Sequence, residues 1–161
     1  MIVIVMGVVG AGKTTVGLLL ANQLGWRFAD ADDFHPQANI DKIRHGISLT
    51  DADRQPWLER LRMAIKEWIK EGSNLVLACS ALKENYRQIL DVSPAVQFVY
   101  LKGSASLIAQ RLRSRQGHFA NEQILASQFA DLEEPEAAVV EDISQTPQQI
   151  VADIRQKLKL A

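Results

Sequence analysis

Short apolar runs alternate with helix-like stretches along most of the chain. Runs of the first kind are typical of buried strands, and they lie at 2–6, 26–29, 74–79, 96–101 and, more weakly, 137–140. The intervening stretches predict helices at 16–24, 38–44, 51–70, 82–90, 105–115, 122–132 and 147–160. This alternation predicts an α/β fold in three layers, with a five-stranded parallel sheet between two layers of helices.

The longest predicted helix, at 51–70, has clear signals at both ends. Thr50 or Asp51 can cap its start, and Gly72 follows its end. Pro56 lies close to that start, and proline is tolerated only in the first turn of a helix. We therefore expect the regular helix to begin nearer Arg54 or Gln55 than Asp51.

A complete phosphate-loop motif, G-x-x-x-x-G-K-[ST], follows the first strand and precedes the first helix. Its glycines permit positive φ, so that backbone amides can converge on phosphate oxygens at the positive end of the helix dipole. The motif therefore predicts a P-loop NTPase fold that binds a nucleoside triphosphate. The predicted ATP-binding residues are Gly7, Val8, Val9, Gly10, Ala11, Gly12, Lys13, Thr14 and Thr15.

Two side chains of this motif have predicted roles of their own. Lys13 should reach the β and γ phosphates, and Thr14 should offer its hydroxyl to Mg²⁺. The competing interpretation is a glycine-rich turn with a chance lysine, which the flanking strand and helix disfavour.

Length, charge and cysteine content limit the class of protein. With 161 residues and 47% hydrophobic residues, the chain has the size of one domain, spanning 1–161. A formal net charge of −1 argues against a nucleic-acid partner. No apolar run approaches the ~20 residues that span a bilayer, so we expect no membrane partner. Cys79 is the only cysteine, which excludes an internal disulfide and fits a cytoplasmic enzyme.

Carboxylates gather directly after the second predicted strand, where a parallel sheet places its ligands. Asp30 and Asp32 suit a pair in which one group accepts the proton of an acceptor hydroxyl and the other holds a metal-bound water. Along an extended segment, alternation would put both on one face with Ala31 turned away. The alternative is a solvated acidic loop in which Asp30 or Asp33 caps a neighbouring element.

Three cations fall on the same side of the sheet and would suit an acceptor that carries a carboxylate: Arg54, Lys83 and Arg87. Each has a structural alternative. Arg54 could pair with Asp51 or Asp53 at a helix start. Lys83 and Arg87 are spaced i, i+4 on a predicted helix, and a solvated helix face explains Arg87 equally well.

A basic stretch at 111–119 ends one helix and predicts a lid, at about 115–130, that closes over the nucleotide. Arg111 and Arg115 lie one turn apart and would face the same way. His35 and His118 are expected to contact substrate or lid at most. We expect Trp26, Trp57, Trp68 and Cys79 to pack in the core.

Several longer motifs resemble the gluconokinase family, and together they span nearly the whole chain. They are Asp30-Ala31-Asp32 with His35-Pro36, the run from Leu49 to Leu58, Cys79-Ser80-Ala81-Leu82-Lys83 with Tyr86-Arg87, Tyr100-Leu101-Lys102-Gly103, Arg115 with Gly117-His118-Phe119, and Ser127-Gln128-Phe129 with Leu132-Glu133-Glu134-Pro135. The resemblance implies ATP-dependent phosphorylation of D-gluconate at its terminal hydroxyl, on a nucleoside-monophosphate-kinase-like fold with a short lid. Members are cytoplasmic and often homodimeric.

The resemblance, with that to the related shikimate kinases, also implies roles for single residues. Asp30 would help to hold Mg²⁺ through water, Asp32 would contact the acceptor hydroxyl, and Arg54 would lie near the substrate carboxylate. His35 and Lys83 would be further substrate contacts. On the nucleotide side, Arg111 and the loop near 145–147 would contact the adenine. Arg115 would lie in the lid. Together with Lys13 and Asp32, it would be a catalytic residue.

Two other functions compete with gluconate phosphorylation. Shikimate kinases would place a run of glycines after the third strand, where this chain has Ser80-Ala81-Leu82. A nucleotide-dependent switch would use the phosphate loop without an acceptor, and Asp32 would then be dispensable for turnover.

Overall fold

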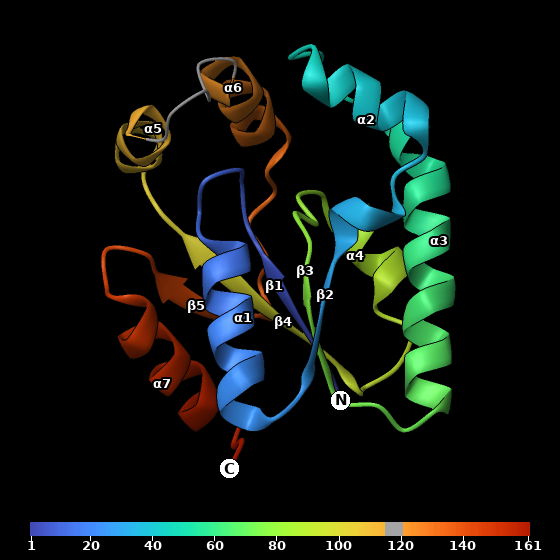
Figure 1. Cartoon of the computed structure of the whole chain (residues 1–161), viewed down its shortest axis with the longest axis vertical. Helices are drawn as coiled ribbons and strands as arrows, with labels where there is room; N and C mark the ends of the chain where they lie inside the picture. Colours follow the sequence, from blue (N-terminus) through green and yellow to red (C-terminus); the bar gives the residue numbers. More distant parts are fainter. Residues whose placement is uncertain (115–120) are drawn as a thin grey trace.

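A twisted, five-stranded parallel sheet forms the middle layer of the protein (Figure 1). The computed structural model describes residues 1–114 and 121–161. The sheet order is β2-β3-β1-β4-β5, and every neighbouring pair is parallel, as the sequence predicts. The strands are β1 (Ile2–Met6), β2 (Arg27–Asp30), β3 (Leu75–Ala78), β4 (Val96–Lys102) and β5 (Val139–Asp142).

Helices cover both faces of this sheet, which gives the three expected layers. In Figure 1, α1 and α7 lie in front of the left part of the sheet, and α3 and α4 lie to its right. The helices are α1 (Lys13–Leu24), α2 (Gln37–Arg44), α3 (Asp51–Lys70), α4 (Glu84–Leu90), α5 (Ala105–Arg113), α6 (Asn121–Asp131) and α7 (Pro147–Lys157), with a short 3₁₀ helix, η1 (Ala31–Phe34), after β2.

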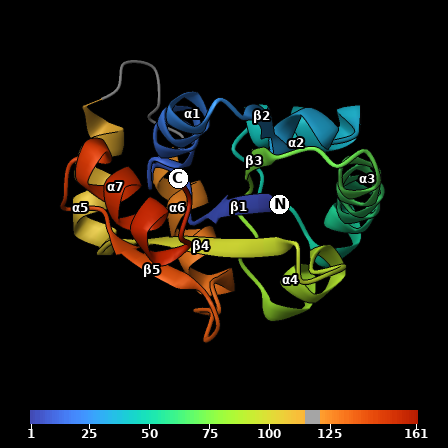
Figure 2. The ribbon, with the colours of Figure 1, turned by 90° about the horizontal axis from the view of Figure 1, so that it is seen from below.

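The central strand β1 is fully buried, because both of its faces meet helices. Val3 and Val5 pack with Leu20 of α1 and Val151 of α7. On the other face, Ile4 packs in a second cluster with side chains of α3 and α4. Figure 2 shows these helices from below, with α1 and α3 on opposite sides of β1. Two apolar clusters thus hold the carboxyl ends of the strands at one edge, beside α2 and α6.

Most element boundaries lie within a few residues of those predicted, and the differences have local causes. β5 runs from Val139 rather than 137, and its pairing with β4 sets this register. Helix α4 begins at Glu84 because Lys83 has extended backbone angles at the N-cap position. The predicted end of α5 at 115 lies outside the described residues, and the described helix ends at Arg113.

The expected late start of the longest helix is wrong, since α3 begins at Asp51 despite Pro56. Thr50 accepts a hydrogen bond from the Asp53 amide, and the Asp53 carboxylate accepts one from the Thr50 amide. This reciprocal capping box fixes the first turn before the proline is reached. The stabilisation from this cap therefore exceeds the cost of the one helical hydrogen bond that is missing at the Pro56 nitrogen.

The lid predicted at about 115–130 is described only in its second half. That half is α6, which contacts α5 and stands beside the phosphate loop in Figure 1. Arg115 and His118 lie outside the described residues. No described helix is long and apolar enough to cross a membrane.

Glu141 on β5 is a buried carboxylate whose ionisation opposes folding. Its side chain is 1% exposed and accepts from Lys157 at 2.9 Å, while no donor among the described residues reaches its Oε1. Burial, together with hydrogen bonding to Asp153, raises the pKa of Glu141 from 4.5 to about 7. The folded state thus binds this proton more tightly than the unfolded state does.

We therefore expect Glu141 to stabilise the protein below about pH 4.5 and to lose that contribution as the pH rises through 7. Glu141→Gln should remove this part of the pH dependence and raise Tm at pH 8 by roughly a few degrees. Thermal melts at pH 5 and pH 8 test it, with Glu136→Gln as an exposed control. Equal pH dependence in wild type and Glu141→Gln would contradict it.

Candidate active site

The phosphate loop joins the end of β1 to the start of α1, as the motif predicts. Gly10 and Gly12 have φ of 82° and 99°, values that side chains other than glycine rarely adopt. The loop is internally braced, because the Ala11 amide donates to the Val8 carbonyl at 3.1 Å. Lys13 opens α1 and folds back over the loop, where its Nζ donates to the Gly7 and Val8 carbonyls at 3.1 and 3.0 Å.

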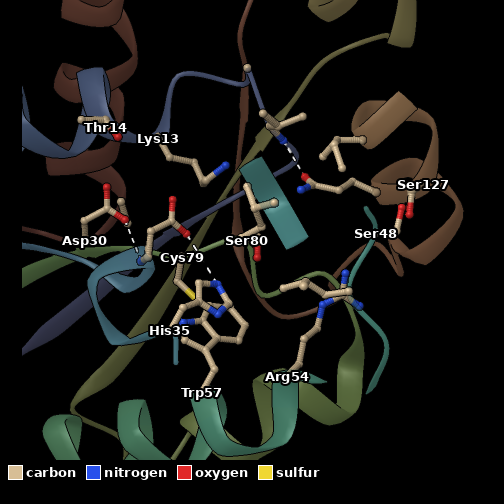
Figure 3. A pocket seen from close by; sticks show the side chains of 18 of the residues that line it. Lys13, Thr14, Asp30, His35, Ser48, Arg54, Trp57, Cys79, Ser80 and Ser127 are labelled. Atoms are coloured by element: carbon tan, nitrogen blue, oxygen red, sulfur yellow. Dashed lines mark hydrogen bonds and ion pairs between the residues drawn. The ribbon is translucent and has the colours of Figure 1, made fainter. Parts of the chain in front are cut away.

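A cavity of about 310 Å³ opens beside this loop at the carboxyl ends of the strands. This volume is at the lower end of the range for small-molecule sites. Figure 3 shows Thr14 and Asp30 on one side of it and Arg54 on the other. Its walls come from the phosphate loop and the start of α1, the ends of β2 and β3, the segment after β2, the end of α2 with the segment joining it to α3, the first turns of α3, and α6. They include Lys13, Thr14, Thr15, Asp30, Asp32, His35, Ile43, Ile47, Ser48, Arg54, Trp57, Cys79, Ser80, Ser127 and Gln128.

The acidic segment after β2 reaches the cavity, but its backbone differs from our expectation. It forms η1, and not an extended strand, because the Asp30 side chain accepts from the Asp32 amide at 2.9 Å and caps this turn. The alternation argument for Asp30 and Asp32 is therefore wrong, although both carboxylates do line the cavity. Ala31 is buried, and its carbonyl accepts a hydrogen bond from Trp57 Nε1 at 2.7 Å.

The two carboxylates and Lys13 share one electrostatic environment. Protein atoms around the cavity partly desolvate the Asp32 carboxylate and raise its pKa, although most of the side chain is open to solvent; Lys13 opposes this rise and Asp33 adds to it. The pKa of Asp30 is also raised, chiefly by burial and further by the charges of Asp32 and Asp33. A carboxylate with a raised pKa is a stronger base than an ordinary aspartate, which suits proton abstraction from a hydroxyl.

His35 is a buried wall of the cavity rather than a surface loop residue. Its ring stacks on Trp57, with centroids 4.5 Å apart and an interplanar angle of 11°. Burial, and secondarily the charge of Arg54, lowers the pKa of His35 to about 4. The imidazole is therefore neutral at physiological pH. Its Nε2 lies 3.9 Å from Asp32 Oδ1.

Arg54 is the one buried arginine among the described cavity-lining residues. Its Nη1 donates to Tyr86 Oη at 2.9 Å and to Asp131 Oδ2 at 3.0 Å. Arg54 therefore forms its ion pair with Asp131 at the end of α6, and not with Asp51 or Asp53 as the sequence alternative proposed. A guanidinium carries further N–H donors, so these two bonds leave capacity for a ligand carboxylate.

The other two predicted cations do not line the cavity. Lys83 forms an ion pair with Asp51 at 2.9 Å, and that carboxylate also accepts from Tyr86. Arg87 is buried and donates to the carbonyls of Ala81 and Leu82 at 2.8 and 3.0 Å. The solvated-face interpretation of Arg87 is therefore wrong, and its position indicates that it braces the segment after β3.

A second cavity, of about 200 Å³, lies behind the phosphate loop. Arg111, Gln145 and Pro147 line it together with Gly12 and Thr15. Arg111 donates to the Ile143 carbonyl at 2.6 Å, which fixes the guanidinium at the rim. The residues expected around adenine are thus brought together next to the phosphate loop.

Two site contacts were not predicted, because they join parts of the chain far apart in sequence. Gln128 Oε1 accepts from the Val9 amide at 2.7 Å and ties α6 to the phosphate loop. Trp57 is buried, as expected, but it also forms a cavity wall under His35. Only the resemblance drew attention to Gln128, and no periodicity distinguishes it.

The residues present fit a magnesium ion held in the usual way. Among the described residues, no three His, Cys, Asp or Glu side chains converge as a metal site. Mg²⁺ needs no such cluster, since it commonly takes one or two protein oxygens, substrate phosphates and water. The Thr14 hydroxyl and the Asp30 carboxylate line the cavity beside Lys13 and have suitable oxygens.

Comparison with known proteins gives relatives over nearly the whole chain. The shikimate kinase family model matches residues 9–159. A gluconokinase of Gluconobacter oxydans (strain 621H) is 48% identical over 134 residues, covering 82% of this chain and 75% of that protein. The thermoresistant gluconokinase of Escherichia coli (strain K12) is 40% identical over 163 residues, covering 98% and 93%. The crystal structure of a gluconokinase from Sinorhizobium meliloti 1021 matches with a TM-score of 0.83 at 38% identity, covering 98% and 94%.

Proposed function

The chain belongs to the gluconokinase family of shikimate-kinase-like P-loop kinases, and we propose that it phosphorylates D-gluconate at its terminal hydroxyl with ATP. The observation that carries the proposal is one cavity that joins the phosphate loop, the Asp32 carboxylate and the Arg54 guanidinium. Such a cavity can hold a phosphoryl donor, a base and an acidic acceptor together. The product is 6-phospho-D-gluconate.

The nucleotide would lie across the phosphate loop, with its base in the second cavity. Arg111 and the segment that contains Gln145 and Pro147 suit an adenine there. Lys13 would leave the loop carbonyls to contact the β and γ phosphates, where its charge stabilises the transferring group. Thr15 and the loop amides would complete the phosphate contacts.

Asp32 is proposed as the general base for the acceptor hydroxyl. It would accept that proton while the hydroxyl oxygen attacks the γ phosphorus and ADP leaves. Its open position in the cavity, with 81% of the side chain exposed, supports access by substrate.

Mg²⁺ would be held by Thr14 and, through water, by Asp30. When bound, the ion supplies positive charge that offsets the negative charge developing on the phosphates. Asp30 would keep its bond to the Asp32 amide and so orient the base at the same time.

Arg54 is proposed as the partner of the gluconate carboxylate. Arg54→Ala should raise the KM for gluconate by about 10- to 100-fold, as for the loss of a hydrogen bond to a charged group. The KM for ATP should stay within about twofold. Initial-rate kinetics measure both, with Arg60→Ala on the exposed face of the same helix as the control. An unchanged KM for gluconate would remove this role.

Identification of the product tests the proposed reaction. Phosphorus NMR with proton–phosphorus correlation should place the new phosphoester on the terminal CH₂ of gluconate. A phosphoester at another carbon would contradict the proposed substrate orientation, and no phosphoester would contradict the reaction itself. Shikimate in parallel tests the second candidate, which is supported by the family model alone.

The remaining parts of the proposal concern two further substrate contacts, the lid, and the location and assembly of the protein. His35 lines the cavity and suits a substrate contact, whereas Lys83 would reach substrate only by leaving Asp51. The single domain with its lid and a cytoplasmic location stay predictions from the sequence, and Arg115 as a catalytic lid residue and a homodimer stay predictions from the family resemblance. Light scattering on the purified protein would test the homodimer.

A further inference from the structure

We propose that Asn39 is a positioning residue that fixes His35 as the Nε2–H tautomer, so that this N–H donates to an acceptor hydroxyl beside Asp32. Asn39 lies on α2, one helical turn after His35, and its side chain is buried. The acceptor part of this inference rests on the proposed function, whereas the tautomer rests on hydrogen bonding alone.

The orientation of the Asn39 amide follows from its contact with a backbone carbonyl. Its Nδ2 lies 2.8 Å from the Asp53 carbonyl oxygen. A carbonyl only accepts, so the NH₂ end of the amide must face it, and the opposite orientation would bring two oxygens together.

The same Nδ2 lies 3.2 Å from His35 Nδ1. An NH₂ group has two hydrogens and accepts none, so one hydrogen goes to the Asp53 carbonyl and the other to His35. His35 Nδ1 must therefore be the unprotonated nitrogen of a neutral ring. The proton of that ring is on Nε2.

The ring is also held against rotation. Stacking on Trp57 fixes its plane, and Trp57 is itself anchored by its bond to the Ala31 carbonyl. A half turn of the ring about its axis would replace Nδ1 by a carbon opposite Asn39 and lose that hydrogen bond. Nε2 therefore stays on the cavity side, 3.9 Å from Asp32 Oδ1.

This arrangement suits an acceptor with more than one hydroxyl. Asp32 accepts hydrogen bonds and His35 Nε2–H donates one. The site therefore offers a ligand one acceptor and one donor side by side. A hydroxyl that accepts from His35 would hold a polyhydroxy acid in place while Asp32 faces the reacting hydroxyl. The low pKa of His35 keeps this donor neutral, so it does not pair with Asp32 as an ion.

Nitrogen-15 NMR of the ring nitrogens tests the tautomer directly in the wild-type protein. We expect His35 to show an unprotonated Nδ1 and a protonated Nε2 at neutral pH. His45 is an internal comparison, because its Nδ1 lies 2.7 Å from the Asp41 carbonyl and must donate to it. Substitution of each of the 3 histidines by glutamine assigns the signals. A protonated Nδ1 on His35 overturns the proposal.

Asn39→Asp tests the role of the amide. A carboxylate has no hydrogen to give, so His35 Nδ1 should become protonated. Gln37→Glu is a matched control, because Gln37 is an exposed amide on the same helix, and it should leave the His35 signals unchanged. An unchanged His35 spectrum in Asn39→Asp would overturn the positioning role, even if that variant were less stable.

Two substitutions of His35 test the use of Nε2–H in catalysis. Glutamine places an amide N–H near the position of Nε2, whereas asparagine places one near Nδ1. We expect kcat/KM for gluconate to fall about tenfold further in His35→Asn than in His35→Gln, with KM for ATP unchanged in both. Equal losses would overturn the donor role. Absence of gluconate turnover in wild type would instead refute the proposed function and leave the tautomer result standing.

Discussion

Asp32→Asn should lower kcat for gluconate phosphorylation by about 10²- to 10⁴-fold, the usual contribution of a general base. Asparagine keeps the size and polarity of the side chain but cannot accept the proton. The KM values for ATP and gluconate should change little, because the loss concerns the transition state. Steady-state kinetics with both substrates varied measure these constants.

Asp33→Asn is the matched control for this variant. Asp33 is the adjacent carboxylate, it is exposed, and it does not line the cavity. Its removal should leave kcat near wild type at pH 8. A loss in Asp33→Asn as large as that in Asp32→Asn would show that the loop, and not the base, had been damaged.

The pH dependence of kcat/KM is a second test of Asp32 as the general base. Partial desolvation in the cavity raises the pKa of Asp32, and the charge of Asp33 raises it further. Because the base must be deprotonated, kcat/KM should fall on the acid side at a pH above that of an ordinary aspartate. Asp33→Asn should move this acid limb to lower pH, since it removes a neighbouring negative charge. No acid limb in wild type would argue against an aspartate base.

Lys13→Met should lower kcat by about 10²- to 10³-fold, comparable to the loss of one preorganised donor to a developing charge. Methionine keeps the apolar stem of lysine but removes the ammonium group that we assign to the β and γ phosphates. The coupled ADP assay at saturating gluconate measures this loss.

Lys13 also contacts the Gly7 and Val8 carbonyls, so its loss could disturb the loop itself. A thermal melt within a few degrees of wild type would separate the two effects. Lys66→Met, an exposed position on α3, controls for the loss of one positive charge. Near-normal turnover in Lys13→Met would be incompatible with phosphate-loop catalysis.

Local sequence was sufficient to predict the sheet and the phosphate loop. Both faces of β1 are covered by helices, which explains its continuous apolar run, and Gly10 and Gly12, which have positive φ, lie within the motif itself. The capping box at Thr50 and Asp53 was also legible from its i, i+3 spacing. We predicted only a cap at Thr50 or Asp51 and did not identify this box, so Pro56 led us to expect a later start.

Contacts between distant segments could not be predicted in this way. Arg54 and Asp131 lie 77 positions apart, and Val9 and Gln128 lie 119 apart. No local pattern reports such pairs, because they exist only once α6 packs beside the cavity. The turn after Asp30 has a purely local cause that we nevertheless missed. The Asp30 side chain accepts from the amide two residues later, and this bond favours a turn over an extended strand.

Release of ADP that depends on an added acceptor is the direct test of the proposed reaction. Purified protein with Mg·ATP would be assayed with D-gluconate, shikimate, glucose, adenosine monophosphate and no acceptor. We expect strong stimulation by gluconate alone. Stimulation by another acceptor in place of gluconate would contradict the assigned substrate, and ATP turnover that no acceptor changes would contradict the kinase itself in favour of a nucleotide-dependent switch.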